Sequence, residues 1–145
     1  MGVRRWFLLA LLCWAACVPS EENWPDGRPE ILDVNFLDIP SSRSQKLGFV
    51  LQFADTDGDL ESGSLMITVN ENIDSEIRLK DLFAAQMPKL SPTASEGELR
   101  FEVSLSGINL VNGEFVDFEF ALCDASGQTS NRTSLRLLTV IREAD

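Results

Sequence analysis

The chain has 145 residues, with 12 Lys and Arg against 23 Asp and Glu, no histidine, and a formal net charge of −11. Such an acidic surface repels nucleic acid and anionic lipid headgroups, because both bind proteins through positive charge. The lack of histidine also excludes Ser–His and Cys–His catalytic pairs. Because of the acidic charge we expect no nucleic-acid partner.

The first 16 residues have the layout of a secretory signal peptide. Arg4 and Arg5 precede an uncharged apolar run of eleven residues that ends at Ala16. This run is too short for a transmembrane helix, which needs about 20 apolar residues. We expect residues 1–16 to be removed during export. Their removal takes away two basic residues and no acid, which leaves 10 basic and 23 acidic residues, a net charge of −13 over 129 residues.

The segment Trp14-Ala15-Ala16-Cys17 resembles the signal region of bacterial lipoproteins, with Trp14 where Leu, Val or Ile is usual. In that family a cysteine after small residues is lipidated and becomes the new N-terminus. The resemblance implies that Cys17 carries acyl chains such as palmitate, which suffice for stable membrane anchoring. Val18 resembles the residue found in lipoproteins that are sent to the outer membrane. The alternative is an ordinary signal peptide and a protein secreted without a lipid anchor.

The remainder divides into a linker and one domain. Residues 17–29 are rich in Pro, Ser, Asn and acids, which predicts a flexible lipid-anchored linker. Residues 30–145 are enough for a single core of ordinary size. Cys13 leaves with the leader and Cys17 is the lipidation candidate, so Cys123 has no partner for an intramolecular disulfide. The domain must therefore be held together by its hydrophobic core.

Seven segments show the two-residue alternation of strands with one buried face. The predicted strands are residues 30–39, 46–54, 64–70, 76–80, 98–105, 115–123 and 133–142. The first is expected to place Leu32, Val34 and Phe36 on one face. The clearest inward-facing sets are Leu99, Phe101, Val103 and Leu105, and Val116, Phe118, Phe120 and Leu122. One helical turn is predicted at residues 81–87, capped by Asp81 and ended by Pro88.

Seven short strands separated by polar turns predict an all-β fold, a single immunoglobulin-like antiparallel β-sandwich. The stretches FADTDGDL at residues 53–60 and CDASGQTSN at residues 123–131 resemble bacterial immunoglobulin-like domains of the cadherin or fibronectin-III type. The resemblance covers roughly residues 30–142. The Cys…Trp…Cys core and the tyrosine corner of antibody-type domains are both absent from the sequence.

The loop that follows the second predicted strand carries acids at alternate positions around Gly58. Such a loop supplies the oxygen ligands that Ca²⁺ requires. It is not an EF-hand, because Leu60 stands where that motif needs glycine and Met66 stands where it needs a bidentate glutamate. It resembles instead the DxDG-type loop of cadherin-like domains.

In an immunoglobulin-like sandwich this loop shares one end with the loop before the last strand. We therefore expect Asp124, together with the Asn131 side chain, to lie near the acidic loop, and the chain to enter the domain at the same end. The predicted calcium ligands are Asp55, Asp57, Asp59, Glu61 and Asp124. The alternative is a solvated acidic turn without a metal, since Asp and Gly are favoured in turns on their own account.

These observations favour a non-catalytic cell-envelope lipoprotein of the outer membrane. Its immunoglobulin-like domain would serve adhesion, assembly or another protein interaction, with calcium as a stabilising ligand and the partner docking on an edge strand or a loop end. No catalytic residue is predicted, and the chain is not expected to be an enzyme. The alternative function is an ion or small-ligand carrier that is exported or secreted without a lipid anchor.

Overall fold

The computed structural model describes residues 27–37, 46–71 and 73–139. The predicted signal peptide, Cys17 and most of the predicted linker lie outside these residues. Within the part of the chain that is described, no helix has both the length and the apolar character needed to cross a bilayer.

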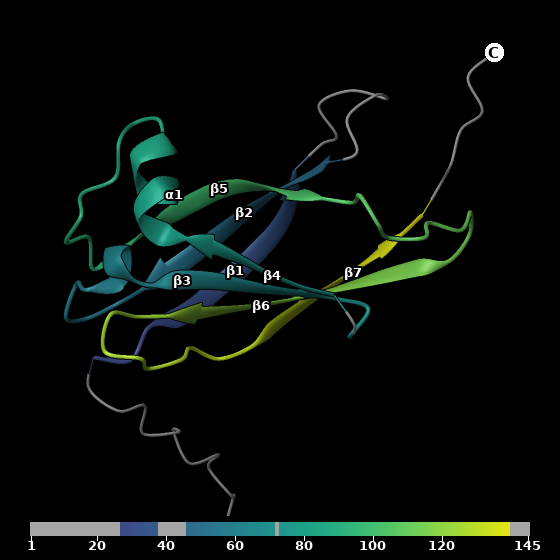
Figure 1. The fold of residues 1–145 in the computed structure, drawn as a ribbon. Coiled ribbons are helices and arrows are strands. Elements are labelled where there is room, and N and C mark those ends of the chain that lie inside the picture. Colours follow the sequence, from purple (N-terminus) through teal and green to yellow (C-terminus); the bar gives the residue numbers. More distant parts are fainter. Residues whose placement is uncertain (1–26, 38–45, 72, 140–145) are drawn as a thin grey trace, which may run out of the picture.

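The domain is an all-β sandwich of two antiparallel sheets, as the sequence predicts (Figure 1). One sheet has the order β1-β2-β5 and the other has the order β4-β3-β6-β7. Because β5 returns to pair with β2 rather than with β4, the chain crosses between the layers in the Greek-key manner of immunoglobulin-like sandwiches. The elements are β1 (Glu30–Leu37), β2 (Lys46–Ala54), η1 (Leu60–Ser62), β3 (Ser64–Val69), β4 (Ile73–Arg78), α1 (Leu79–Ala85), β5 (Glu96–Ser104), β6 (Phe115–Cys123) and β7 (Thr133–Leu138).

The core lies between the sheets and is built from the inward-facing residues of each strand. In β6 these are the predicted ones, Val116, Phe118, Phe120 and Leu122, and all four are buried. Phe49 in β2 is fully buried, and its ring centroid lies 5.1–6.0 Å from those of four other phenylalanines. Burying one such side chain contributes about 2 kcal/mol. The aromatic cluster therefore gives the domain a stable centre that needs no disulfide.

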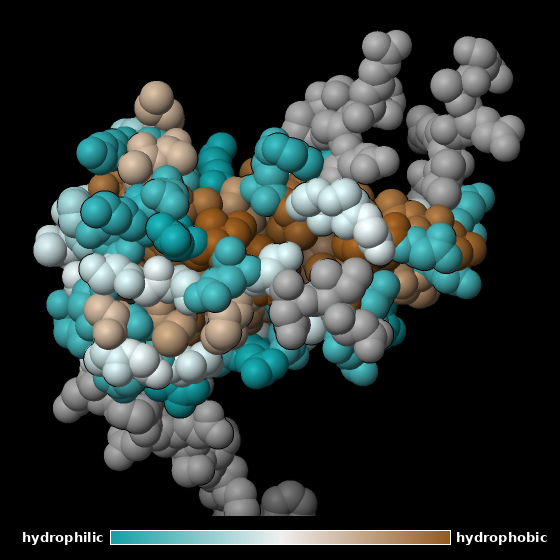
Figure 2. Space-filling model, viewed as in Figure 1, coloured by the Kyte–Doolittle hydropathy of each residue, from teal (hydrophilic) through white to brown (hydrophobic). Residues whose placement is uncertain are grey.

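Hydrophobic surface remains at the end of the sandwich opposite to the start of β1. Figure 2 shows this surface on the right, where β6 starts and β7 ends. Phe115 and Leu138 are cross-strand partners here, and they are 58% and 53% exposed. Val111 in the preceding loop is 41% exposed. These side chains lie outside the core. β6 has its predicted bounds, whereas β7 ends at Leu138 and Thr139 is already outside the strand predicted over residues 133–142.

The first strand contains a β-bulge that the alternation rule does not anticipate. Ile31 pairs with Phe53 and Asp33 pairs with Gln52, so Leu32 is the extra residue between them. The bulge turns Ile31 inward and leaves Leu32 55% exposed. The prediction that Leu32 faces the core is therefore wrong. Val34, which is buried, and Phe36, whose ring packs edge-on against Phe49, do share the inner face.

The fourth strand and the helix both begin earlier than predicted. The strand covers Ile73–Arg78 and the helix covers Leu79–Ala85, with Asp81 in its first turn rather than at its cap. The residue before the helix, Arg78, makes no side-chain capping hydrogen bond. Leu79, Leu82 and Phe83 are buried on one face of the helix. Burial of this apolar face, rather than a capping signal, thus determines where the helix starts.

Two amide side chains close the outer edges of the three-stranded sheet. The Asn131 side chain accepts a hydrogen bond from the Ile31 backbone N–H at 2.7 Å and donates one to the Ile31 carbonyl at 2.9 Å. On the other edge, the Gln86 side chain accepts from the Arg100 N–H at 2.9 Å and donates to the Arg100 carbonyl at 3.1 Å. Each amide thus takes the place that a neighbouring strand would occupy.

Candidate metal centre

The predicted calcium loop lies at one end of the sandwich, where three distant stretches of the chain meet (Figure 1, left). The start of β1 pairs with the end of β2, and the start of β3 pairs with the end of β6. The loop of residues 55–61 and the hairpin of residues 124–130 therefore share this end with the entry of the chain into the domain. This arrangement agrees with the expectation from immunoglobulin-like topology.

Asp55 is the most buried member of the acidic loop. It directly follows β2 and is 0% exposed. Its backbone N–H donates to the Ser95 carbonyl at 2.7 Å, and its Oδ2 accepts from the Leu60 N–H at 3.0 Å. Its Oδ1 is buried without a hydrogen-bond donor among the described residues. Burial, and then the neighbouring Asp57 carboxylate, raise the pKa of Asp55 to about 6.

Asp57 and Asp59 bring two further carboxylates to Asp55. One oxygen from each of the three lies within 4.8 Å of the others. Asp57 is exposed, whereas Asp59 is half-buried and has an Oδ1 without a hydrogen-bond partner. Burial raises the pKa of Asp59, with further contributions from the charges of Asp124 and Asp57. The three carboxylates therefore repel one another in the absence of a positive charge.

Asp124 approaches the loop from the last hairpin, as predicted. It is 4% exposed, and its Oδ1 accepts from the Ser126 hydroxyl at 2.8 Å and from the Gln128 N–H at 2.7 Å. These bonds hold the carboxylate in one orientation. Its Oδ2 is buried without a partner. The effect of Asp124 on the pKa of Asp59 shows that its charge acts on the acidic loop.

Two other predicted neighbours of the site are placed differently. Glu61 lies in η1, and its carboxylate does not belong to the group of oxygens within 4.8 Å of one another. The amide of Asn131 is engaged with the backbone of Ile31 and so fixes β1 to the hairpin instead of joining the carboxylates. The observed cluster is thus Asp55, Asp57 and Asp59, with Asp124 beside it.

Gly63 is a structural residue of this site that sequence reasoning missed. A Cβ at this position would lie 1.8 Å from the Cys123 carbonyl oxygen and 3.0 Å from the Asp124 Cα. Only glycine permits this approach of the two backbones, which brings the end of the acidic loop next to Asp124. The sequence shows the glycine but not the backbone that it contacts.

The available donor atoms suit a hard divalent cation. Asp55, Asp57 and Asp59 offer carboxylate oxygens within 4.8 Å of one another, and the neighbouring hairpin carries the buried, unpartnered Oδ2 of Asp124 outside that group. Ca²⁺ accepts six to eight oxygens in flexible geometry, and water completes shells that the protein leaves open. Softer metals prefer nitrogen and sulfur ligands. With no histidine in the chain, a calcium-type shell is the best match to this donor set.

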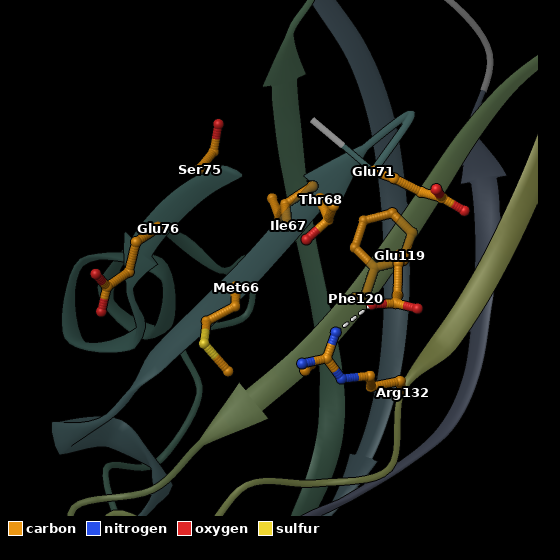
Figure 3. Close-up of a pocket in the computed structure, with 10 residues that line it drawn as sticks. Met66, Ile67, Thr68, Glu71, Ser75, Glu76, Glu119, Phe120 and Arg132 are labelled. Atoms are coloured by element: carbon orange, nitrogen blue, oxygen red, sulfur yellow. Dashed lines mark hydrogen bonds and ion pairs between the residues drawn. The ribbon is translucent and has the colours of Figure 1, made fainter. Parts of the chain in front are cut away.

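A second surface feature is a groove on the outer face of the four-stranded sheet, with a volume of about 530 Å³ (Figure 3). Its floor includes Met66 and Thr68 of β3, and Arg132 reaches across to form an ion pair with Glu119. An adjoining groove of about 510 Å³ contains the ion pair of Arg136 with Asp117. Both hollows lie on the sheet face, away from the acidic loop. Polar and apolar side chains line both grooves, and Arg132 and Arg136 are already ion-paired there.

No family model matches this chain, and no curated protein sequence matches it either. Among solved structures, the chain is similar to the spore cortex lytic enzyme SleM of Clostridium perfringens, with 16% sequence identity and a TM-score of 0.42. The similarity covers 77% of this chain and 28% of that protein. At this level it carries no conclusion about activity.

Proposed function

We propose that the chain is a non-catalytic, calcium-binding immunoglobulin-like domain that acts as an interaction module of the cell envelope. The observation that carries calcium binding is the set of buried oxygens without partners on Asp55, Asp59 and Asp124. A buried carboxylate oxygen without a partner costs about 1–3 kcal/mol or more. A bound cation would offset this cost for Asp55 and Asp59, which form with Asp57 one group of carboxylate oxygens within 4.8 Å of one another.

The alternative of a solvated acidic turn is less well supported. A turn of that kind keeps its carboxylates in water, where their charges are screened. Asp55 and Asp124 are instead at least nine-tenths buried, and both face away from solvent on ordered backbone. We infer that these two residues form the base of the site and that the exposed Asp57 completes its outer side.

Calcium is expected to raise the melting temperature of the domain by about 10 °C when free Ca²⁺ exceeds its dissociation constant about a hundredfold, equivalent to about 2.7 kcal/mol. The cause is preferential binding to the folded state, since the unfolded chain does not hold the carboxylates of Asp55, Asp57 and Asp59 together. Differential scanning calorimetry in excess calcium and in chelator measures the difference, and isothermal titration calorimetry gives the affinity.

The double variant Asp57→Asn, Asp59→Asn should lose this calcium-dependent shift. The matched control is Glu76→Gln, Glu114→Gln, which removes the same charge from two exposed positions outside the cluster and should keep the shift. Identical melting of the native protein in calcium and in chelator would contradict the proposal. Equal loss of the shift in both double variants would point to net charge rather than to a site.

The proposed location at the outer membrane rests on the sequence of the first 18 residues. Cys17→Ser is expected to move the protein from the membrane fraction to the soluble fraction, because serine cannot carry the thioether-linked lipid. Cell fractionation followed by mass measurement of the mature N-terminus checks this. The control is Cys13→Ser, which alters the predicted leader but not the lipidation site. If native Cys17 carries no lipid, the protein belongs to the secreted alternative.

The interaction role draws on the shape and charge of the domain. The two adjoining grooves on the four-stranded sheet are lined by polar and apolar side chains, and their arginines are ion-paired with Glu119 and Asp117 of β6. This surface fits a protein partner better than an apolar small ligand, which prefers a concave hydrophobic pocket. The paired charges serve orientation and specificity more than raw affinity. We therefore favour a protein-interaction module over a small-ligand carrier.

A further inference from the structure

The chain enters the domain in direct contact with the acidic loop. Gly27 is buried and has a backbone φ of +84°. A Cβ added to it would lie 2.5 Å from Oδ2 of Asp57 and 3.7 Å from Nε2 of Gln128. The backbone at Gly27 therefore packs against the carboxylate of the one exposed aspartate in the cluster, on the side that faces the last hairpin.

The residues that follow Gly27 are fixed to that hairpin. The Arg28 guanidinium donates through Nε to the Thr129 carbonyl. Three residues later, the Asn131 side chain makes its two hydrogen bonds to the Ile31 backbone. Since the same hairpin carries Asp124, residues 27–31 span from one part of the candidate metal centre to the other.

This contact has a consequence for Asp57. Because it is exposed, its carboxylate could turn into water and away from the negative charges of Asp55 and Asp59. The backbone of Gly27 occupies one side of the space available to this carboxylate and so restricts its positions. A metal ligand that is held in place by its surroundings loses less conformational freedom on binding than a mobile one.

We propose that Gly27 is a positioning residue of the metal centre, which holds the Asp57 carboxylate toward the ion. Cation binding and docking of residues 27–31 on the domain then stabilise each other. By thermodynamic linkage the coupling is reciprocal, so whatever strengthens one strengthens the other by the same factor. This inference rests on the proposed calcium binding and names how that site is coupled to the entry of the chain.

The test compares Gly27→Ala with Gly113→Ala in the full-length mature protein. Gly113 has a nearly identical φ of +82° and nothing within 4 Å of an added Cβ, so both variants carry the same backbone strain. Titration calorimetry with Ca²⁺ should show a dissociation constant at least about tenfold higher for Gly27→Ala, because the added Cβ would push the Asp57 carboxylate out of its position and disturbed support of a metal ligand typically costs that much. Gly113→Ala should bind calcium as the native protein does.

A second measurement needs no variant. Hydrogen exchange of the native protein should slow at residues 27–31 when Ca²⁺ is added, and should not change at residues 107–113 at the other end of the sandwich. Native calcium affinity in Gly27→Ala, or unchanged exchange at residues 27–31 while calcium binds, overturns the inference and leaves the proposed function standing. If the native protein does not bind calcium at all, the proposed function fails together with it.

Discussion

Replacing Gly63 with alanine is expected to destabilise the domain by more than about 4 kcal/mol, or to prevent folding altogether. The added Cβ would lie 1.8 Å from the Cys123 carbonyl oxygen and 2.8 Å from its carbon, and both are backbone atoms. Ser64 pairs with Cys123 across the sheet, so the two strands cannot separate here without losing hydrogen bonds. Gly63 is also tied by its own N–H to Leu60 and by its carbonyl to the Leu79 N–H.

Gly48→Ala is the matched control for this prediction. Gly48 also lies on extended backbone, in β2, but its added Cβ would meet the Leu37 Cβ at 3.3 Å, a contact that a displacement of a few tenths of an ångström relieves. Urea denaturation followed by circular dichroism measures both variants. A loss of less than about 1 kcal/mol for Gly63→Ala, no greater than that for Gly48→Ala, would show that the two backbones are not in contact.

In calcium-free buffer the domain is expected to lose up to about 3 kcal/mol of stability as the pH rises from 4 to 7 because of Asp55 alone. Its pKa is raised from 3.8 to about 6 in the folded protein, so between these values the folded state holds a proton that the unfolded state has released. Stability falls with pH wherever the folded state binds more protons. This loss of stability is absent below about pH 4 and grows as the pH rises. It is complete above the pKa that Asp55 has in the folded protein.

Asp55→Asn isolates this effect from the other carboxylates. The pKa of another carboxyl group moves in the opposite direction: that of Asp117 is lowered by its hydrogen bond to Arg136. The asparagine oxygen can still accept from the Leu60 N–H, but the side chain does not titrate. The difference in unfolding free energy between the two proteins should change across pH 4 to 7 in favour of the variant. Parallel curves would mean that Asp55 ionises normally.

The strands and their faces could be predicted because local alternation decides them. The inward set of β6 follows from the sequence, and so does that of β5, where Leu99, Phe101 and Val103 are buried. The bulge at Leu32 could not be predicted, because one extra residue leaves no mark on the pattern. The sequence places Leu79 in a strand for a similar reason, since a buried leucine fits a strand end or a helix start equally well.

The candidate metal centre is predictable only in part. The alternation of acids around Gly58 brings Asp55, Asp57 and Asp59 together locally, and fold topology adds Asp124. Glu61 was included because it continues the same spacing, but the η1 turn interrupts the alternation there. The contact of Gly27 with Asp57 depends on how distant segments pack, which no spacing in the sequence reveals.

The amide side chains of Asn131 and Gln86, bonded to the outer strands of the smaller sheet, affect whether copies of the domain can join through their strand edges at high concentration. An incoming chain could not pair with the N–H and carbonyl of Ile31 or Arg100, because these are already bonded to Asn131 and Gln86. Exposed strand edges are templates for polymerisation. Each amide therefore hinders the addition of a strand at one point of β1 and one point of β5.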